Sequence, residues 1–308
     1  MNAMIIDANK LISKLQALRG KEYLFRGHSD AGYWLQPKAF RPDGKKELQE
    51  KFKGSSWKTW ISSQEIQSIF GPHVDKMLAE RICELGLYML QYNYTLAKKV
   101  ESNVDNFDAK TIEKYQMQPP DFWIQKDAFV NLVQRLSLSI IGKVHLDGTV
   151  LQYSEFYEFL TAFDESFPQH YGVPTAALDW TYDPYVALSF ALEFIPENAK
   201  YISIWVYEKI RNSEHSPVKI SHASDGCNNP RIKRQHGTFT RFDDKAFAFY
   251  FLKTGKFPRI EEYEHHSDAE FKLFKYDISV EEKYLLEEAL KREGIKYDYH
   301  YLMCPDIH

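Results

Sequence analysis

Gln169-His170-Tyr171-Gly172-Val173-Pro174-Thr175, followed closely by Leu178-Asp179-Trp180-Thr181, is the stretch of this chain on which fold and site both depend. Polar and aromatic residues gathered around a Gly and a Pro are typical of a rigid loop rather than of a core strand or helix. Asp183 followed by Pro184 then predicts a helix start, with Asp as N-cap and Pro at the first position. Because a helix N-terminus favours anions, this stretch predicts a ligand site.

The bulk composition indicates a globular protein without a strong electrostatic field. The chain has 308 residues, 44% hydrophobic and 27% charged, and a formal net charge of −4. This length suits one large domain or two modest ones. The mild acidity gives no global attraction to nucleic acid or to an anionic membrane, although local patches can still provide one.

Cysteine usage and the N-terminus point to a cytoplasmic protein. Cys83, Cys227 and Cys304 are widely spaced, which argues against a disulfide framework and a thiolate zinc site. Histidines with metal-ligand spacing are lacking, so we expect no metal. The chain lacks a signal-peptide pattern and an apolar run long enough to span a bilayer, so we expect no membrane partner.

The first half of the sequence reads as helical. A short helix is expected over 7–18, and then a strand over 22–26 that Gly27 ends. From residue 45 to 167, apolar residues recur at three- and four-residue spacing, the pattern of buried helix faces. A short helix over 154–163 belongs to this part.

The second half alternates strands and helices. Residues 201–207, 237–242 and 272–278 are rich in β-branched and aromatic residues and predict strands, whereas 217–229 predicts an irregular loop. Ser279 with Glu282 predicts a capping box, and Gly294 predicts the end of the helix that follows. The fold class expected is α+β, with a central mixed or antiparallel sheet. It forms a single domain over 1–308 with a helical insertion at 45–167.

Phe25-Arg26-Gly27-His28 is the first of three polar clusters. Gly27 permits close backbone approach, and the Arg26 guanidinium offers a planar fork for a phosphate or carboxylate. The alternative is that Arg26 pairs with an internal acid.

The second cluster is the opening stretch itself. Asp179 lies between two apolar residues and needs a partner, for which Arg26 is a candidate. His170 is a candidate general base or ligand contact, and the alternative is a buried, hydrogen-bonded histidine. Thr181 and Asp183 are explained most simply as helix caps.

The third cluster runs from Asn229 to Thr240 and is locally basic through Arg231, Lys233 and Arg234, a patch that Arg241 extends. Gln235-His236 repeats the Gln-His pair of the opening stretch, so the three clusters would form a pocket if they converge. The alternative is a solvated basic hairpin. The chain has no P-loop, H-E-x-x-H, G-x-S-x-G or G-x-G-x-x-G, which argues against a kinase, a metalloenzyme and a serine hydrolase.

Taken in their order along the chain, the three clusters resemble the FRG domain, a family named for a Phe-Arg-Gly motif. Besides Phe25-Arg26-Gly27, the matching segments are Pro37–Arg41, Gln169–Thr175 with Leu178–Thr181 and Pro184–Leu188, Asn229–Ile232 with Gln235–Phe239, Glu293–Ile295 and Cys304–Asp306. The resemblance spans about residues 20 to 306. Two positions depart from it: Ala176-Ala177 stands where Arg-Leu is more frequent, and His236 stands where a second Gln is common.

The Phe-Arg-Gly motif is also similar to the first motif of arginine-serine-glutamate ADP-ribosyltransferases, in which the Arg holds NAD. The chain has no matching Ser-Thr-Ser strand, and Glu261-Glu262 is its nearest stand-in for the acidic loop. These resemblances imply a nucleotide-binding domain for NAD or ADP-ribose in a toxin or anti-phage defence effector. As an enzyme it would be an NAD-dependent ADP-ribosyltransferase or an NAD glycohydrolase.

The residues that this interpretation assigns fall into two groups. Asp179 and His170 are the candidate catalytic residues, with Glu262 as a weaker candidate carboxylate. The candidate ligand contacts are Arg26, His28, Gln169, Tyr171, Thr181, Arg231, Gln235 and His236. The rival interpretation is a non-catalytic sensor that binds protein or nucleic acid near Arg231–Arg241 through charge alone.

Overall fold

The computed structural model describes residues 3–51, 56–71, 74–102, 104, 109, 112–113, 120–145, 174–210, 216–221, 234–263 and 270–295. The chain divides into two compact units. The first comprises residues 1–36, 178–243 and 259–308, and the second comprises 37–177 and 244–258. Each unit is described by itself. The prediction of a single domain with an insertion at 45–167 stays a prediction.

The first unit is built on a seven-stranded sheet in the order β1-β7-β4-β2-β3-β6-β5. The strands are β1 (Met4–Ile5), β2 (Tyr23–His28), β3 (Leu178–Thr181), β4 (Tyr201–Lys209), β5 (Val218–Ser221), β6 (Gly237–Phe242) and β7 (Phe271–Ser279). The edge strand β1 runs parallel to β7, and the other neighbours are antiparallel. The expected α+β class with a mixed sheet is therefore confirmed. The early strand β2 joins the later sheet as predicted, between β4 and β3.

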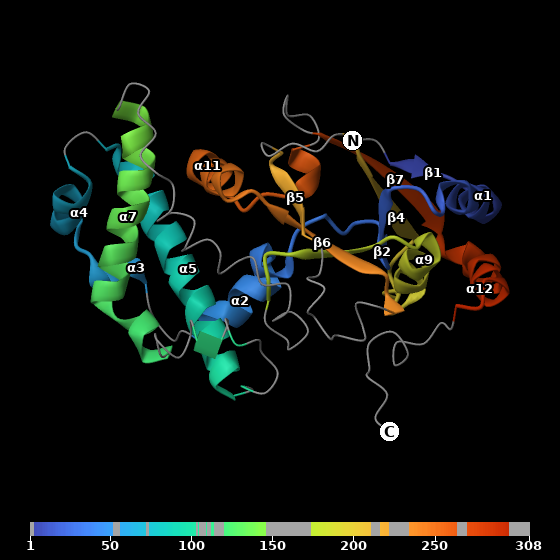
Figure 1. Cartoon of the computed structure of the whole chain (residues 1–308), viewed down its shortest axis with the longest axis horizontal. Helices are drawn as coiled ribbons and strands as arrows, with labels where there is room; N and C mark the ends of the chain where they lie inside the picture. The colour runs from blue at the N-terminus through green and yellow to red at the C-terminus, as the bar shows by residue number, and fades with distance from the viewer. Residues whose placement is uncertain are drawn as a thin grey trace. The chain divides into compact units, whose positions relative to one another are not determined.

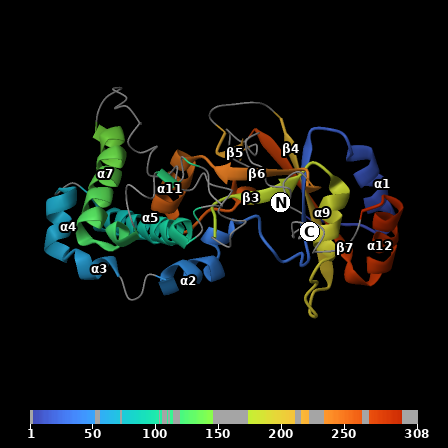
Figure 2. The same ribbon diagram turned by 60° about the horizontal axis from the view of Figure 1, so that its bottom comes forward.

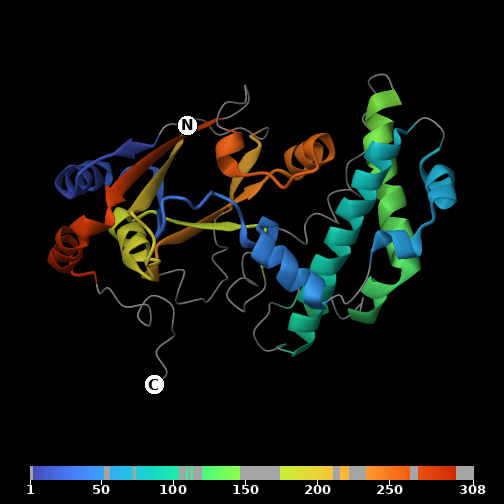
Figure 3. The ribbon, with the colours of Figure 1, turned by 180° about the vertical axis from the view of Figure 1, so that it is seen from behind.

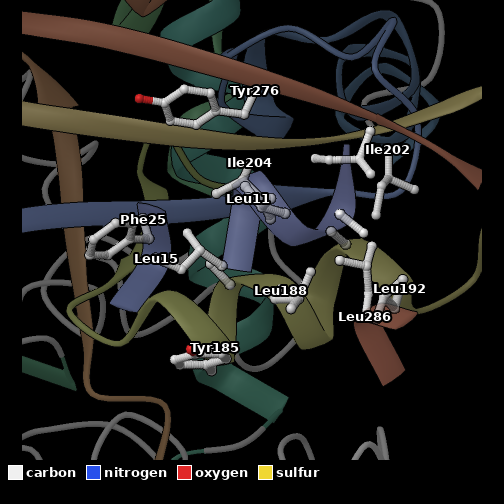
Figure 4. Close-up of a cluster of buried hydrophobic side chains, with 14 of the residues drawn as sticks. Leu11, Leu15, Phe25, Tyr185, Leu188, Leu192, Ile202, Ile204, Tyr276 and Leu286 are labelled. Carbon is white, nitrogen blue, oxygen red and sulfur yellow. The ribbon is translucent and has the colours of Figure 1, made fainter. Parts of the chain in front are cut away.

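One face of the sheet is covered by helices α1 (Ala8–Leu18), α9 (Pro184–Leu192) and α12 (Lys283–Arg292). Figure 1 and Figure 2 show these helices gathered beside β2, β4 and β7. The buried cluster between the two layers is apolar almost throughout (Figure 4). Its members include Leu11, Leu15, Phe25, Leu188, Leu192, Ile202, Ile204, Val206, Ile278 and Leu286. Burying each such side chain contributes about 1.5–3 kcal/mol, which makes this layer the main source of stability in the unit.

Gly27 lies inside β2 and does not end the strand, which corrects the prediction for this position. A Cβ atom at Gly27 would lie 1.9 Å from the Ala187 carbonyl oxygen and 2.6 Å from the Ala191 amide nitrogen. Both atoms belong to the backbone of α9, so the helix packs directly on the strand at this point. The Gly of the Phe-Arg-Gly motif is thus explained by close packing.

Polar contacts connect the ends of the three helices. Asp183 caps α9 by accepting a hydrogen bond of 2.8 Å from the Tyr185 amide, as the sequence predicts. The Arg19 guanidinium contacts the carboxylates of Asp183 and Glu293, which joins the end of α1 to α9 and α12. Gly294 follows α12 with a φ of 70°, in agreement with its predicted role as a helix stop.

The expected capping box is only half present. Ser279 accepts from the Glu281 amide at 3.2 Å, but a short 3-10 helix, η7 (Val280–Glu282), precedes α12. Glu282 accepts instead from the Ala8 amide at 2.7 Å. This carboxylate therefore caps α1 rather than its own helix, because the two helices begin side by side at the same end of the sheet.

The sequence does not predict three of the strands. One of them, β1, has only two residues. The sequence suggests a polar loop for Leu178–Thr181, but this segment forms β3, next to β2 in the sheet. It suggests an irregular loop for Val218–Ser221, but this segment forms the edge strand β5. All three are too short for alternation to be recognised.

The second unit is helical, as the sequence predicts for the described part of 45–167, whereas the helix over 244–254 is not predicted. Its helices are η1 (Lys38–Phe40), α2 (Pro42–Lys51), α3 (Trp57–Trp60), α4 (Ser63–Phe70), α5 (Lys76–Ser102), η3 (Pro120–Ile124), α7 (Lys126–His145) and α11 (Asp244–Thr254). Figure 3 shows the long helices α5 and α7 side by side. They approach closely at Gly86, where a Cβ would lie 2.9 Å from Val133 Cγ2. The helix expected over 154–163 lies outside the described residues.

Across the described part of the chain, no helix is both long and apolar enough to cross a membrane.

Candidate functional site

The face of the sheet opposite the helices carries polar and aromatic side chains in register. Side chains alternate along a strand, and directly paired residues of neighbouring strands share a face. The pairing therefore places side chains of this face in two rows that run across β2, β4 and β7. Arg26 on β2 pairs with Trp205 on β4, which pairs with Lys275 on β7. At the centre of this face, His28 and Trp205 are buried, with exposed fractions of 5% and 3%. Arg26 and Lys275 are partly buried.

The second row lies beside the first and consists of His28, Ser203 and Asp277. Their relative exposures are 5%, 0% and 9%. An antiparallel sheet commonly has one apolar face and one solvated face, so buried polar rows on the second face are unusual and need partners.

A pocket of about 260 Å³ opens over β4 and β7 on this face. Its lining residues all belong to the first unit: Ala3, Ala31, Gly32, Tyr33, Trp34, Trp205, Glu261 and Lys275. Aromatic rings form much of the wall, with one ammonium and one carboxylate among them. This combination of apolar rings with a few polar groups is typical of a small-molecule site.

The outer wall of the pocket is the turn after β2. Asp30 stabilises it by accepting hydrogen bonds from the Gly32 amide at 2.7 Å and, through its carbonyl, from the Tyr33 amide at 3.1 Å. The turn presents Tyr33 and Trp34, which are 48% and 53% exposed. The guanidinium of Arg259 stacks over the Trp34 ring at 4.2 Å, which adds a second cation at the rim.

Lys275 occupies the floor. Its ammonium donates to the Ala31 carbonyl at 2.6 Å and lies 3.3 Å from an Asp277 oxygen. It also lies 5.5 Å from the centre of the Trp205 ring. An ammonium has three N–H donors, and these two partners use two of them. Burial raises the pKa of Asp277, and the adjacent Lys275 partly offsets this effect.

Glu261 is the carboxylate of the pocket. It belongs to the short helix η6 (Ile260–Glu262), and its Oε1 accepts from the Leu35 amide at 3.1 Å. The Ile260 amide donates to the Leu35 carbonyl at 3.0 Å, so residues 35 and 260–261 hold each other through two hydrogen bonds. Burial raises the pKa of Glu261 above its ordinary value. The neighbouring Glu262 is exposed and caps the same turn by accepting from the Arg259 amide.

Of the predicted site residues, Arg26 and His28 lie on the pocket side of the sheet. The Nε of Arg26 donates to His28 Nε2 at 2.9 Å, and its Nη1 donates to the main-chain carbonyl of Asp179 at 2.5 Å. The His28 ring packs edge-on against Tyr33 and Trp205, two pocket residues. Arg26 is one strand away from the pocket, beyond Trp205.

The predicted residues Thr181 and Asp179 lie on the helix-covered face of the sheet, opposite the pocket. Thr181 pairs directly with Phe25, a residue of the helix-covered core, so alternation places Thr181 and Asp179 on the helix side of β3. The contact that the structure records between Arg26 and Asp179 is through the main-chain carbonyl of Asp179. The proposed roles of these two residues in ligand binding and catalysis stay predictions.

Gln235 and His236 form the connection into β6. The hydroxyl of Thr181 donates to the Gln235 carbonyl at 2.6 Å, and the Tyr182 amide donates to the His236 carbonyl at 3.1 Å. His236 has a φ of 46°, in the left-handed region, and its side chain is exposed. The recorded bonds use the main chain of both residues, so they define the shape of the turn.

Four predicted site residues, Gln169, His170, Tyr171 and Arg231, lie outside the described residues. Their convergence with Arg26 stays a prediction, and so does the nucleic-acid surface at Arg231–Arg241. Within the described ranges, no group of three His, Cys, Asp or Glu side chains is arranged to hold a metal ion.

The pocket residues Trp205, Lys275, Tyr33 and Trp34 were not predicted. Tyr33-Trp34 directly after a glycine is a signal that could have marked an aromatic turn. Trp205 and Lys275 carry no such signal, because they look like ordinary residues of alternating strands.

The first unit is an α+β unit that carries a pocket beside its sheet, and comparison with known proteins gives one family match. The family model of the FRG domain matches residues 151–200, a segment that includes β3 and α9. This match confirms the resemblance to the FRG domain. The resemblance to ADP-ribosyltransferases has no such match and stays a prediction. No curated protein and no solved structure matches the chain.

Proposed function

We propose that this FRG domain protein binds a nucleotide of the NAD or ADP-ribose class in the pocket over β4 and β7. The observation that carries the proposal is the joint presence of Trp205, Tyr33 and Trp34 with Lys275 and Glu261 around one pocket. Rings of this kind stack on a base or a pyridine ring, and an ammonium meets a phosphate.

The size of the pocket limits what it would take. About 260 Å³ is slightly below the usual range for a whole drug-sized ligand. The pocket therefore suits one ring with its ribose, and the rest of a dinucleotide would extend outward past Trp34. Arg259 at that rim is placed to meet a phosphate.

Any chemistry at the glycosidic bond of a bound NAD would need a carboxylate near the ribose to stabilise an oxocarbenium-like state. Glu261 is the carboxylate beside this pocket, whereas the side chain of Asp179 belongs to the other side of the sheet. An ADP-ribosyltransferase or NAD glycohydrolase activity at this site would thus depend on Glu261.

Calorimetric titration of the whole chain with NAD, ADP-ribose and AMP tests the proposal. Lys275→Gln should weaken binding about tenfold or more, the loss expected for one charge-assisted hydrogen bond. Lys272→Gln is the matched control, because it removes the same charge from the same strand on the opposite, exposed side. Absence of binding to the wild type, or equal affinities for the two variants, would refute the proposal.

The alternative is a protein or nucleic-acid partner at Arg231–Arg241. Salt-sensitive RNA binding that is lost in Lys233→Gln, together with no nucleotide binding, would favour it.

A further inference from the structure

Two buried polar groups among the pocket residues have no hydrogen-bond partner among the described residues. Trp205 is 3% exposed, and nothing in the described part of the chain accepts a hydrogen bond from its indole Nε1. The Oε2 of Glu261 is also buried, and no described donor reaches it. The great majority of buried polar atoms in proteins are paired, so each of these groups calls for an explanation.

The two unpartnered groups have opposite hydrogen-bonding character. An indole N–H only donates, and an ionised carboxylate oxygen only accepts. Both side chains line the same pocket, together with the stacking surfaces of Tyr33 and Trp34. A ligand that satisfies both must offer an acceptor and a donor, and the stacking surfaces favour a flat group.

We propose that the pocket selects a planar ring whose uncharged edge carries an adjacent acceptor and donor, the acceptor for Trp205 and the donor for Glu261. This inference rests on the proposed function and specifies which end of the nucleotide enters. Two groups of an NAD-class ligand have this edge: the carboxamide of nicotinamide and the aminopyrimidine edge of adenine.

The same geometry excludes close analogues. A nicotinic acid ring would place a carboxylate against the Glu261 carboxylate, and two like charges in a buried site repel. A purine without the 6-amino group would leave Glu261 Oε2 without a donor. Rejection of an analogue that lacks one required hydrogen bond is strong, because the pocket group stays unpaired.

Titration with two pairs of ligands tests this proposal and identifies which end of the dinucleotide enters the pocket. The first pair is nicotinamide mononucleotide and nicotinic acid mononucleotide, and the second is AMP and purine riboside monophosphate. At neutral pH the wild type should prefer the first member of one pair by at least about tenfold. That pair names the ring that occupies the pocket.

Glu261→Gln is the decisive variant. Its amide oxygen can still accept from the Leu35 amide, while its amide nitrogen turns the unpartnered acceptor into a donor. Discrimination within the preferred pair should therefore vanish or reverse, with nicotinic acid mononucleotide gaining affinity if the pyridine end is bound. Glu262→Gln, an exposed neighbour, should leave discrimination unchanged.

Trp205→Phe removes the indole N–H but keeps a ring at the pocket wall, so affinity for the preferred ligand should fall about tenfold. Trp180→Phe is its control, because the Trp180 N–H already donates to Thr240 Oγ1 at 2.7 Å. Circular dichroism and melting curves show that each variant is folded before titration. Nucleotide binding without discrimination in either pair, or discrimination that survives in Glu261→Gln, would overturn this inference and leave the proposed function standing. No binding of any nucleotide would overturn both.

Discussion

The two faces of the central sheet are built on opposite principles. On the helix side, Phe25, Ile204 and their neighbours pack against α1, α9 and α12 in an almost wholly apolar layer. On the pocket side, the alternate residues of the same strands are Arg26, Trp205 and Lys275. Neighbouring residues of one strand thus serve different purposes.

The contrast between the apolar face and the polar face indicates which face contributes to stability and which is available for binding. Buried apolar side chains contribute to stability, while buried charges and unpaired polar groups oppose it. Ser203 Oγ and Asp277 Oδ1 are both buried, and neither has a hydrogen-bond partner among the described residues. The Lys275 ammonium lies 3.3 Å from Asp277 Oδ1 and forms an ion pair with it. Proteins retain such destabilising arrangements chiefly where a site needs them. The pocket side is therefore where ligand binding is expected.

The largest effect is expected from Gly27→Ala on the helix side. The new Cβ would meet the Ala187 carbonyl oxygen at 1.9 Å, and helix backbone has little room to move. The free energy of unfolding should fall by about 4 kcal/mol or more, measured by denaturant titration. Gly32→Ala on the pocket side is the control, since its Cβ approaches only the Asp30 carboxylate, at 3.2 Å. Equal stability of the two variants would contradict this account of the Phe-Arg-Gly motif.

A smaller loss is expected from Leu188→Ala, which removes a fully buried side chain from α9. The cavity should cost about 2–5 kcal/mol in the free energy of unfolding, while nucleotide binding by the folded protein stays as in the wild type. Leu285→Ala on α12 is a suitable comparison, because that side chain is 41% exposed. A loss of binding in folded Leu188→Ala would mean that the two faces are not independent.

The pH dependence of stability sharpens the comparison further. Burial raises the folded-state pKa of Glu261 above the ordinary value of 4.5, so the folded state holds this proton more tightly than the unfolded state. The resulting stabilisation is complete below 4.5 and is lost as pH rises through the folded-state pKa. Glu261→Gln removes this term. The difference in unfolding free energy between variant and wild type should therefore grow in favour of the variant from pH 4 to pH 7. A difference that is constant with pH would contradict the burial of this carboxyl.

The smallest effect on stability is expected from Trp34→Ala. The side chain is 53% exposed, so unfolding free energy should change by no more than about 0.5 kcal/mol. Nucleotide affinity should nevertheless fall several-fold, because a stacking surface worth about 0.5–1.5 kcal/mol is removed. Phe249→Ala, at a residue 72% exposed on α11, should alter neither quantity much. Unchanged affinity in Trp34→Ala would exclude stacking on this ring.

Much of the fold could be predicted because its signals are local. Asp183-Pro184 marks the start of α9, and the β-branched and aromatic run in 201–207 marks β4. The strand Leu178–Thr181 was missed because it is short and carries Asp179 in its middle, so its polar residues resembled a loop. Its place next to β2 is stabilised by neighbours that are distant in sequence.

The site was predicted only in part for the same reason. The Phe-Arg-Gly motif led to Arg26 and His28, which lie on the pocket side of the sheet. No pattern led to Trp205 or Lys275, and Glu261 entered only through Glu261-Glu262 as a stand-in for an acidic loop. The sequence by itself determined the class of fold, the family resemblance and the helix caps, because each depends on residues close together in the chain. Only the tertiary structure decided which side chains share a pocket. Strand register brings Arg26, Trp205 and Lys275 into one row, and a shift of one residue would move each to the opposite face.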